Sequence, residues 1–446
     1  MRTTGAGKDG AEDTSECESC ADNGVGAADE GGRRSGWGEP PLPDPSGPVR
    51  PPGVAGSAGF LVAGAFVLDC LISASGLPVW GDDLRADAMR TVPGGKALNQ
   101  AVTLARLGVR VAAVGSVGCD PVGEAIRSVL VADGVAVSAM PVRQGAPTPV
   151  CVVHSRPDGE KAVVWRVPDE LAPTAGTLDE AARRLGGRVD ATLLTFEFPS
   201  ATAALVTAAA RVSRWVVVHP APAPAPTADR SALMAAVPWH LVDVLVPNEA
   251  EARALLVGHP GANGPADLLA DALVDRLGVP TVCVTLGAQG CVLRTEGRGG
   301  PDRPGGRSFW HRAPTGPVVD TTAASDAFTA VFTAQLVAGR SPRAAVHAAQ
   351  QAATRTVGRP GGYEALPTQA ELSRLTGTRP GRPDVVSPDP TRPDPVEPHP
   401  VQPNPVGPDL RRSPAARVPA ARMPNLDAVP GRTGWAARSV SSRTPV

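Results

Sequence analysis

The sequence lacks an excess of charge of either sign. Its 43 Lys and Arg residues nearly balance 44 Asp and Glu residues, the formal net charge is −1, and no long basic run appears. Proteins that bind nucleic acids or anionic membranes concentrate positive charge on one surface or segment. The composition therefore predicts neither a nucleic-acid partner nor a membrane partner.

Long apolar stretches are missing as well. No run reaches the roughly 18 apolar residues of a membrane-spanning helix. No apolar stretch follows the N-terminal MRTTGAGKDG, as a secretory signal requires. The seven cysteines are scattered along the chain, which is typical of reduced thiols rather than of a disulfide framework. We expect a cytoplasmic protein without a membrane span.

Several common binding motifs do not occur. There is no GxxxxGK(S/T) loop, no GxGxxG after the first apolar run, and no HExxH or comparable spacing of histidines. These absences argue against a P-loop NTPase, a dinucleotide-binding fold and a histidine metal site. Cys17 and Cys20 form a CxxC, but a zinc site needs two further ligands, so we interpret them as incidental thiols.

Composition divides the chain into three parts. Residues 1–57 are rich in Gly, Pro, Ser, Asp and Glu without periodicity, which predicts a disordered N-terminal tail. Residues 378–446 contain proline at nearly every second or third position of PDPTRPDPVEPHPVQPNPVGP, which predicts an extended tail. That tail is interpreted as a spacer, with a docking peptide as the alternative. Residues 58–377 are predicted to form the folded body.

Apolar runs alternate with helix-period segments through this body. Phe60–Leu68 is predicted to form one buried strand and Ala97–Leu107 a helix; further strands are expected at 111–117, 191–196, 215–218, 242–246 and 282–285. Apolar strands that alternate with helices predict a mostly parallel sheet covered by helices. Residues 148–154 and 161–167 flank a Pro-Asp-Gly turn, which predicts a hairpin that is either a lid or an added edge.

Two segments combine small residues with polar ones at the start of a predicted helix. In the first, VPGGKALNQ at 92–100, paired glycines allow close backbone approach, and Lys96 and Asn99 offer donors to the hydroxyls of a polyol. In the second, DTTAASDAF at 320–328, bare backbone amides and the helix dipole would stabilise phosphate oxygens. Asp326 is placed to accept the proton of an attacking hydroxyl. Each segment alone is equally compatible with an ordinary turn or helix cap.

Two further segments follow predicted strands. Asn248, Glu249 and Glu251 offer oxygen ligands that could organise Mg²⁺ near phosphates, or could simply cap the helix that begins there. The glycine turn at 285–290 suits contact with a nucleotide, although any α/β protein has several such turns.

Together and in this order, these segments resemble the signatures of the ribokinase-like (PfkB-type) carbohydrate kinases. The resemblance covers residues 58–377 and includes GGKALNQ at 94–100, DPVG at 120–123, NEAE at 248–251 and DTTAASDAF at 320–328. Within that family the sequence is most similar to ribokinases proper, which also carry Asp-Thr-Thr-Ala-Ala. The resemblance implies an α/β fold, a three-layer α/β/α sandwich with a mostly parallel, doubly wound sheet and a small β lid that often serves for dimerisation.

The resemblance also implies a role for individual residues. Asp326 would be the catalytic base, and the backbone amides of Ala323, Ala324, Ser325 and Asp326 would form the anion hole. The sugar would be bound by Asp69, Gly95, Lys96, Asn99 and Glu197. ATP and Mg²⁺ would be served by Asn248, Glu251, Thr285, Gly287 and, in the nucleotide region, His219. Asp320 and Thr322 would hold an activating monovalent cation, usually potassium.

Three positions depart from the family pattern. Ser325 stands where a glycine precedes the base, Val67 replaces an asparagine that ribokinases use on the sugar, and His219 stands where asparagine is common. The leading hypothesis is ATP- and Mg²⁺-dependent phosphorylation of a sugar hydroxyl. The alternatives are a catalytically weakened sugar or nucleotide sensor, and a nucleoside kinase. The latter is disfavoured because the chain is only 3% aromatic and base-binding sites usually stack on aromatic rings.

Overall fold

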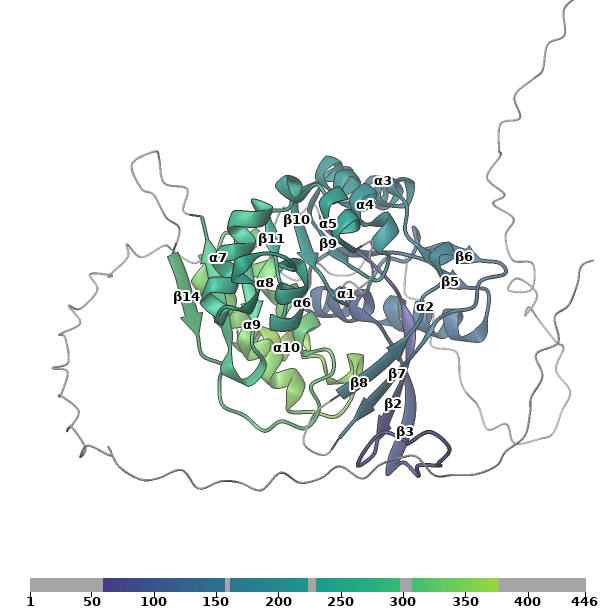
Figure 1. The fold of residues 1–446 in the computed structure, drawn as a ribbon. Coiled ribbons are helices and arrows are strands. Elements are labelled where there is room, and N and C mark those ends of the chain that lie inside the picture. Colours follow the sequence, from purple (N-terminus) through teal and green to yellow (C-terminus); the bar gives the residue numbers. More distant parts are fainter. Residues whose placement is uncertain (1–58, 157–160, 224–229, 297–306, 376–446) are drawn as a thin grey trace, which may run out of the picture. The chain divides into compact units, whose positions relative to one another are not determined.

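The computed structural model describes residues 59–156, 161–223, 230–296 and 307–375 (Figure 1). The predicted tails at 1–57 and 378–446 and the Pro-Asp-Gly turn at 157–159 lie outside these residues. Among the described residues, no helix is long and apolar enough to cross a membrane.

The main sheet has eight strands in the order β14-β13-β12-β11-β10-β9-β1-β4. The strands from β12 to β4 pair in parallel, while β13 and β14 are antiparallel additions at one edge. Their bounds are β1 Phe60–Ala63, β4 Val111–Val114, β9 Val189–Thr195, β10 Ser213–His219, β11 Val244–Leu245, β12 Thr281–Thr285, β13 Cys291–Thr295 and β14 Arg307–His311. The predicted mostly parallel sheet is confirmed.

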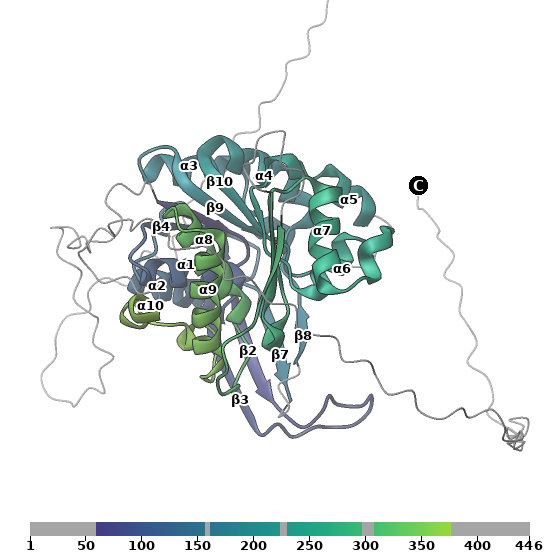
Figure 2. The ribbon, with the colours of Figure 1, turned by 90° about the vertical axis from the view of Figure 1, so that its left-hand side faces the viewer.

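Helices cover both faces of this sheet and give three layers (Figure 2). One face packs against α1 Lys96–Arg106, α2 Pro121–Ala132, α8 Ala324–Val337, α9 Pro342–Val357 and α10 Gln369–Leu375. The other packs against α3 Ala175–Arg184, α4 Pro199–Val212, α5 Arg230–Ala236, α6 Glu249–Leu255 and α7 Ala266–Leu277. Because both faces of the strands are buried, their sequences read as continuous apolar runs.

A second sheet of four strands has the order β3-β2-β7-β8 and projects away from the main sheet (Figures 1 and 2). Its strands are β2 Val67–Ser73, β3 Ala88–Gly94, β7 Val150–Ser155 and β8 Lys161–Trp165. The predicted hairpin is confirmed as β7 and β8, and it belongs to this lid sheet rather than to an edge of the main one. Two strands of two residues, β5 Val117–Gly118 and β6 Val142–Arg143, form a small parallel pair.

The prediction of one strand over Phe60–Leu68 was wrong. The segment is two strands, β1 in the main sheet and β2 in the lid, separated by Gly64, Ala65 and Phe66. A Cβ atom at Gly64 would lie 1.9 Å from the Thr195 hydroxyl oxygen, so only glycine lets the chain pass there. All of β1 and the first residue of β2 are buried, so the apolar run continues across the boundary between the two strands.

The cysteine prediction held in part. Cys70, Cys151, Cys283 and Cys291 are free thiols, as expected for a chain without a disulfide framework. Cys119 is disulfide-bonded, contrary to that expectation. Spacing along the chain does not reveal which thiols approach one another in the fold.

Candidate active site

The site lies at the edge of the main sheet where the parallel strands end. Thr195 ends β9, His219 ends β10 and Thr285 ends β12, and the first two are paired across neighbouring strands. Ligands of open α/β sheets bind at this carboxyl edge. Two helices, α1 and α8, begin there and pack against each other.

Paired glycines bring the lid sheet against the start of α1. Gly95 is the N-cap of α1 with φ 97°, a conformation that other residues rarely adopt. A Cβ atom at Gly94 would lie 2.0 Å from the Asp69 Oδ2 atom, so glycine is also required there. As a result the buried Asp69 carboxylate on β2 accepts a hydrogen bond from the Gly95 backbone N–H.

The start of α8 exposes backbone amides. Its N-cap Ala323 has φ 63°, the left-handed region, which costs about 1–2 kcal/mol for a residue with a Cβ. The first amides of a helix have no intrahelical acceptor, and they carry the positive end of the helix dipole. Ser325 is exposed and lies within the first turn of the helix with an ordinary negative φ, so the absence of glycine there causes no backbone strain.

Asp326 lies in the first turn of α8 and is 4% exposed. The Asn99 Nδ2 atom donates a hydrogen bond to its Oδ2 atom at 2.9 Å, and the Gln100 Nε2 atom donates to Oδ1 at 3.3 Å. The same Gln100 Nε2 atom lies 3.0 Å from His219 Nδ1, which is 3.5 Å from Asp326 Oδ1. Packing of α1 on α8 therefore holds both oxygens of this buried carboxylate.

Gln100 is a site residue that the sequence analysis missed, although it ends the GGKALNQ segment. The family resemblance assigns Asn99 to the sugar, and in the structure its amide nitrogen donates to Asp326. Within the described residues, no hydrogen-bond partner meets Asn99 Oδ1 or Gln100 Oε1, although both atoms are buried. Buried acceptors of this kind are normally satisfied, and the hydroxyl groups of a ligand would satisfy them.

Lys96 sets the electrostatics of the site. Burial lowers the pKa of its ammonium group, but the negative charges of Glu197, Asp326 and Glu251 outweigh burial and leave that pKa above its ordinary value. The Lys96 Nζ atom is 4.0 Å from Glu197 Oε1, and the Thr195 hydroxyl donates to Glu197 Oε2. Lys96 is therefore the positive charge that faces Glu197, Asp326 and Glu251.

Burial raises the pKa of each surrounding carboxyl group. The pKa of Asp326 rises from 3.8 to about 6, although Lys96, Asn99 and Gln100 lower it. The pKa values of Asp69 and Glu251 rise to about 6 and about 7, and that of the fully buried Glu197 also rises. Burial, with a smaller contribution from Lys96, lowers the pKa of His219 to about 3, so its imidazole is neutral at pH 7.

Asn248 and Glu251 form the helix cap that the sequence analysis left open. Asn248 Oδ1 accepts from the Glu251 backbone N–H, and Glu251 Oε2 accepts from the Asn248 backbone N–H, each at 2.8 Å. Glu249 is exposed and pairs with Arg253. The cap does not remove Glu251 from the site, because its buried carboxylate interacts electrostatically with Lys96 and Asp326.

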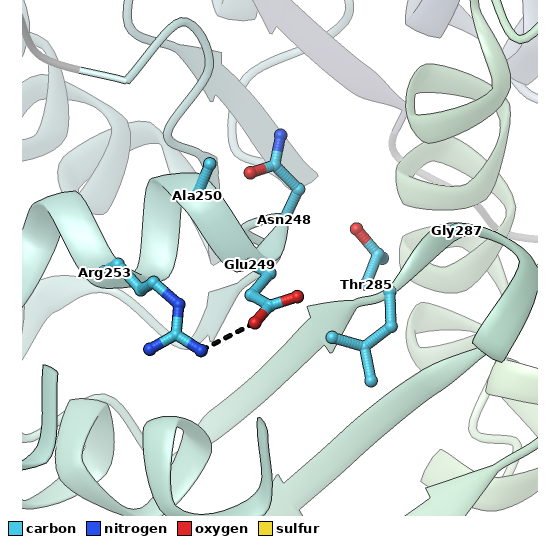
Figure 3. Close-up of a pocket in the computed structure, with 7 residues that line it drawn as sticks. Asn248, Glu249, Ala250, Arg253, Thr285 and Gly287 are labelled. Carbon is cyan, nitrogen blue, oxygen red and sulfur yellow. Dashed lines mark hydrogen bonds and ion pairs between the residues drawn. The ribbon is translucent and has the colours of Figure 1, made fainter. Parts of the chain in front are cut away.

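A pocket of about 410 Å³ lies between the start of α6 and the turn after β12. Figure 3 shows these two segments facing the pocket, with the Glu249–Arg253 ion pair dashed. It is lined by Asn248, Glu249, Ala250, Arg253, Thr285, Leu286 and Gly287. The backbone N–H of Thr285 donates to the Pro247 carbonyl at 2.9 Å and joins the two walls.

Asp320 and Thr322, the predicted ligands of a monovalent cation, lie just before α8. The Thr322 hydroxyl donates to Asp320 Oδ1 at 2.6 Å. The ammonium group of Lys161, from lid strand β8, donates to the Thr322 hydroxyl at 2.6 Å and lies 3.2 Å from Asp320 Oδ1. The lid therefore places a positive charge on both predicted ligands.

The Val67 side chain lies on the same face of β2 as Asp69 and packs with Ala65, Leu171 and Phe198. It forms an apolar surface beside Asp69 where an asparagine would offer a hydrogen bond. Among the described residues, no group of three or more His, Cys, Asp or Glu side chains is arranged to hold a metal ion.

The raised pKa of Asp326 has a consequence for stability. The folded protein binds a proton on this carboxyl group more tightly than the unfolded chain, so its contribution to stability is lost as the pH rises from about 4 through 6. We expect Asp326→Asn to be more stable than the wild type at pH 8 by about 1–3 kcal/mol, since one pKa unit corresponds to about 1.36 kcal/mol. The advantage should vanish near pH 4. Urea unfolding at pH 4, 6 and 8 measures it.

The matched control is Asp120→Asn. Asp120 caps α2, and hydrogen bonds from the backbone N–H groups of Thr148 and Gly123 outweigh the effect of burial and hold its pKa below the ordinary value. This variant should lose stability at pH 8, the opposite sign. An Asp326→Asn protein that is less stable than the wild type at pH 8 would contradict the account.

Comparison with known proteins identifies the family of this chain. The sequence profile described as "pfkB family carbohydrate kinase" matches residues 61–369. The ribokinase of Bacillus subtilis is 30% identical over 319 residues, which cover 70% of this chain and 98% of the relative. The ribokinase of Haemophilus influenzae is 27% identical over 316 residues, or 70% and 95% of the two chains.

The fold is also similar to that of solved ribokinases. A structure of the Arabidopsis thaliana ribokinase complexed with ribose and ATP superposes with a TM-score of 0.57 at 25% identity and covers 72% of this chain and 99% of the other. The ribokinase of Thermotoga maritima gives the same TM-score and identity. The matched residues span the three layers, the lid sheet and the candidate site. On these grounds the chain belongs to the pfkB family of carbohydrate kinases.

Proposed function

We propose that the protein transfers the γ-phosphoryl group of ATP to a hydroxyl group of a sugar, either ribose or a related carbohydrate. The observation that carries this proposal is the buried Asp326 carboxylate at the start of α8, held by the amide groups of Asn99 and Gln100. It lies in the first helical turn, beside backbone amides suited to phosphate. The similar Arabidopsis ribokinase is described with ribose and ATP bound.

In this mechanism Asp326 is the general base. One of its oxygens takes the proton as the sugar oxygen attacks the γ-phosphorus, and the bond from that phosphorus to the β-phosphate oxygen breaks to release ADP. With a pKa of about 6, Asp326 is mostly ionised at pH 7–8 and still basic enough to accept a proton. Asn99 and Gln100 keep its oxygens in place.

The phosphoryl group would be stabilised by the backbone amides of 323–326. The left-handed Ala323 is the N-cap of α8, so these amides lie together at the positive end of the helix dipole. The exposed Ser325 adds a hydroxyl group at this entrance. The neutral His219 adds no charge beside the phosphates.

The sugar would lie between the lid and the start of α1, among Asp69, Gly95, Lys96, Asn99 and Glu197. Carboxylates and amide oxygens there accept hydrogen bonds from hydroxyl groups, while Lys96 donates. The apolar Val67 surface beside Asp69 replaces a hydrogen-bonding group, which changes sugar preference by about 1–3 kcal/mol for an unpaired neutral group.

ATP would occupy the pocket beside Thr285 and Gly287, with its phosphates directed to the start of α8. The oxygen donors at the start of α6 fit Mg²⁺, which prefers such ligands and retains several waters. The cap uses Asn248 Oδ1 and Glu251 Oε2, so we assign Glu251 Oε1 to the hydration shell of the ion. When bound, Mg²⁺ neutralises charge on the phosphates.

A second candidate function, a sugar or nucleotide sensor with weak activity, is favoured by one observation. Ser325 places an exposed side chain at the entrance of the proposed anion hole, where the family pattern has glycine. The preserved Asp326, Asn248 and Glu251 favour the kinase instead. Binding without turnover would distinguish the sensor.

We further propose that residues 58–377 form the kinase domain, that the flanking segments are tails, and that a second copy of the chain covers the lid. Strand β8 lies at the edge of the lid sheet, and Val163, Val164 and Trp165 on it are exposed, as is Met89 on β3. An exposed apolar edge strand favours association with another copy.

The cytoplasmic location stays a prediction.

Asp326→Asn tests the catalytic proposal. The full-length protein is assayed for sugar-dependent ADP formation with Mg²⁺ against pentoses, hexoses and nucleosides. Turnover should fall by about 10²–10⁴-fold in the variant, because the base is lost while the binding groups remain. The dissociation constant for the sugar, measured by calorimetry, should stay nearly unchanged.

Asp179→Asn is the matched control, since Asp179 pairs with Arg211 at the surface, and it should behave like the wild type. Turnover of Asp326→Asn near the wild-type rate would remove Asp326 as the base. Sugar or ATP binding without any turnover in the wild type would support the sensor, with Ser325→Gly as the next protein to assay.

The proposed interface between two copies of the chain at the lid is tested by measuring the molecular mass of the protein in solution. Val164→Asp introduces a charge on the edge strand and should shift the protein from dimer to monomer in sedimentation experiments, because burying that carboxylate is costly. The control Val131→Asp changes an exposed valine on α2, outside the lid, and should leave the dimer intact. A monomeric wild type, or a Val164→Asp dimer, would refute the interface.

A further inference from the structure

The ammonium group of Lys161 is bound by the two residues that the family resemblance assigns to a monovalent cation. It donates to the Thr322 hydroxyl at 2.6 Å and lies 3.2 Å from Asp320 Oδ1. The Lys161 and Asp320 side chains are each 18% exposed. This is a mostly buried, hydrogen-bonded ion pair rather than a surface contact.

The cluster joins three segments that are distant in the sequence. Asp320 Oδ2 accepts from the Gly361 backbone N–H at 3.1 Å, and the Val357 carbonyl accepts from the backbone N–H groups of Val319 and Asp320. Lys161 adds strand β8 of the lid. Three residues after Asp320 lies Ala323, the left-handed N-cap of α8. The cluster thus fixes the loop that presents the first amides of α8.

Asp320 already has a cationic partner in Lys161, whose ammonium group also interacts electrostatically with Asp69 and Asp326. The carboxylate of Asp320 meets one ammonium group, and a second monovalent cation on the same oxygens would face that ammonium at close range. The ammonium group of Lys161 is a compact point charge, as a monovalent cation is. Lys96 and Lys161 are the two lysines within the described residues.

We infer that Lys161 is a built-in replacement for the activating monovalent cation, so the enzyme needs no potassium. A potassium ion does not fit beside Lys161, in disagreement with what the resemblance implies. The same contact couples the lid to the start of α8, because the cation that orders loop 320–323 is carried on a lid strand. Lys161 is a positioning residue, because it acts through the loop at 320–323. The activity readout of the test below rests on the proposed kinase function, whereas the unfolding readout does not.

The test compares the wild type, Lys161→Met and Lys161→Arg as full-length proteins. Each is titrated with potassium chloride at constant ionic strength, with tetramethylammonium as the replacement ion. The readouts are the midpoint of thermal unfolding and the rate of sugar-dependent ADP formation. Arg166→Met, which removes an exposed cation just after β8, is the matched control.

The wild type and Arg166→Met should show no potassium-dependent change in either readout. Lys161→Met should lose about 10–100-fold in turnover without potassium, the usual effect of removing a group that orients a site. Potassium should restore much of this turnover and raise the unfolding midpoint of this variant, because the vacated ligands bind it. Lys161→Arg should stay potassium-independent.

A wild type that potassium activates or stabilises would overturn the inference. So would a Lys161→Met protein that is fully active without potassium, or one whose lost activity and stability potassium does not restore, since Lys161 would then be only a structural contact. If no sugar is phosphorylated by any of the proteins, the proposed function fails, but the potassium dependence of the unfolding midpoint still decides the role of Lys161.

Discussion

The site depends on the burial of four carboxyl groups around the ammonium of Lys96. Asp69, Glu197, Glu251 and Asp326 are all buried, and each interacts with this lysine. Removing carboxylates from water is costly, and their pKa values rise accordingly. Lys96 limits that rise, which keeps Asp326 ionised at neutral pH. Without this positive charge, the pKa of the group proposed as the base would rise further.

The start of α8 is where the other structural constraints meet. Packing against α1 brings Asn99 and Gln100 to Asp326, while the Asp320 cluster ties the preceding loop to the lid and to the segment after α9. The left-handed Ala323 is maintained by these surroundings. The residues proposed to contact the sugar and the phosphate, and those that hold the lid, therefore all meet at the start of α8. A change in any of these contacts is expected to alter the position of Asp326.

Much of the fold and part of the site were predictable from the sequence. Apolar runs and helix periods gave the parallel sheet, and the order of the motifs gave the family. The break at Gly64 was not visible in the sequence because β1 and the first residue of β2 are both buried and therefore both apolar. An apolar run shows that residues are buried, but not that the chain passes from one sheet to another. The contacts of Gln100, His219 and Lys161 depend on how distant helices and strands pack, which no local pattern encodes.

The central claim, that an ionised, buried Asp326 accepts the proton of a sugar hydroxyl, is tested most directly by the pH dependence of kcat/KM. This ratio reports the ionisation of groups in the free enzyme. Because burial raises the pKa values of Asp326 and Asp69 to about 6 and that of Glu251 to about 7, kcat/KM should fall steeply as the pH drops from 8 to 5. A profile that stays flat from pH 8 to 5, in a protein that remains folded, would contradict the account.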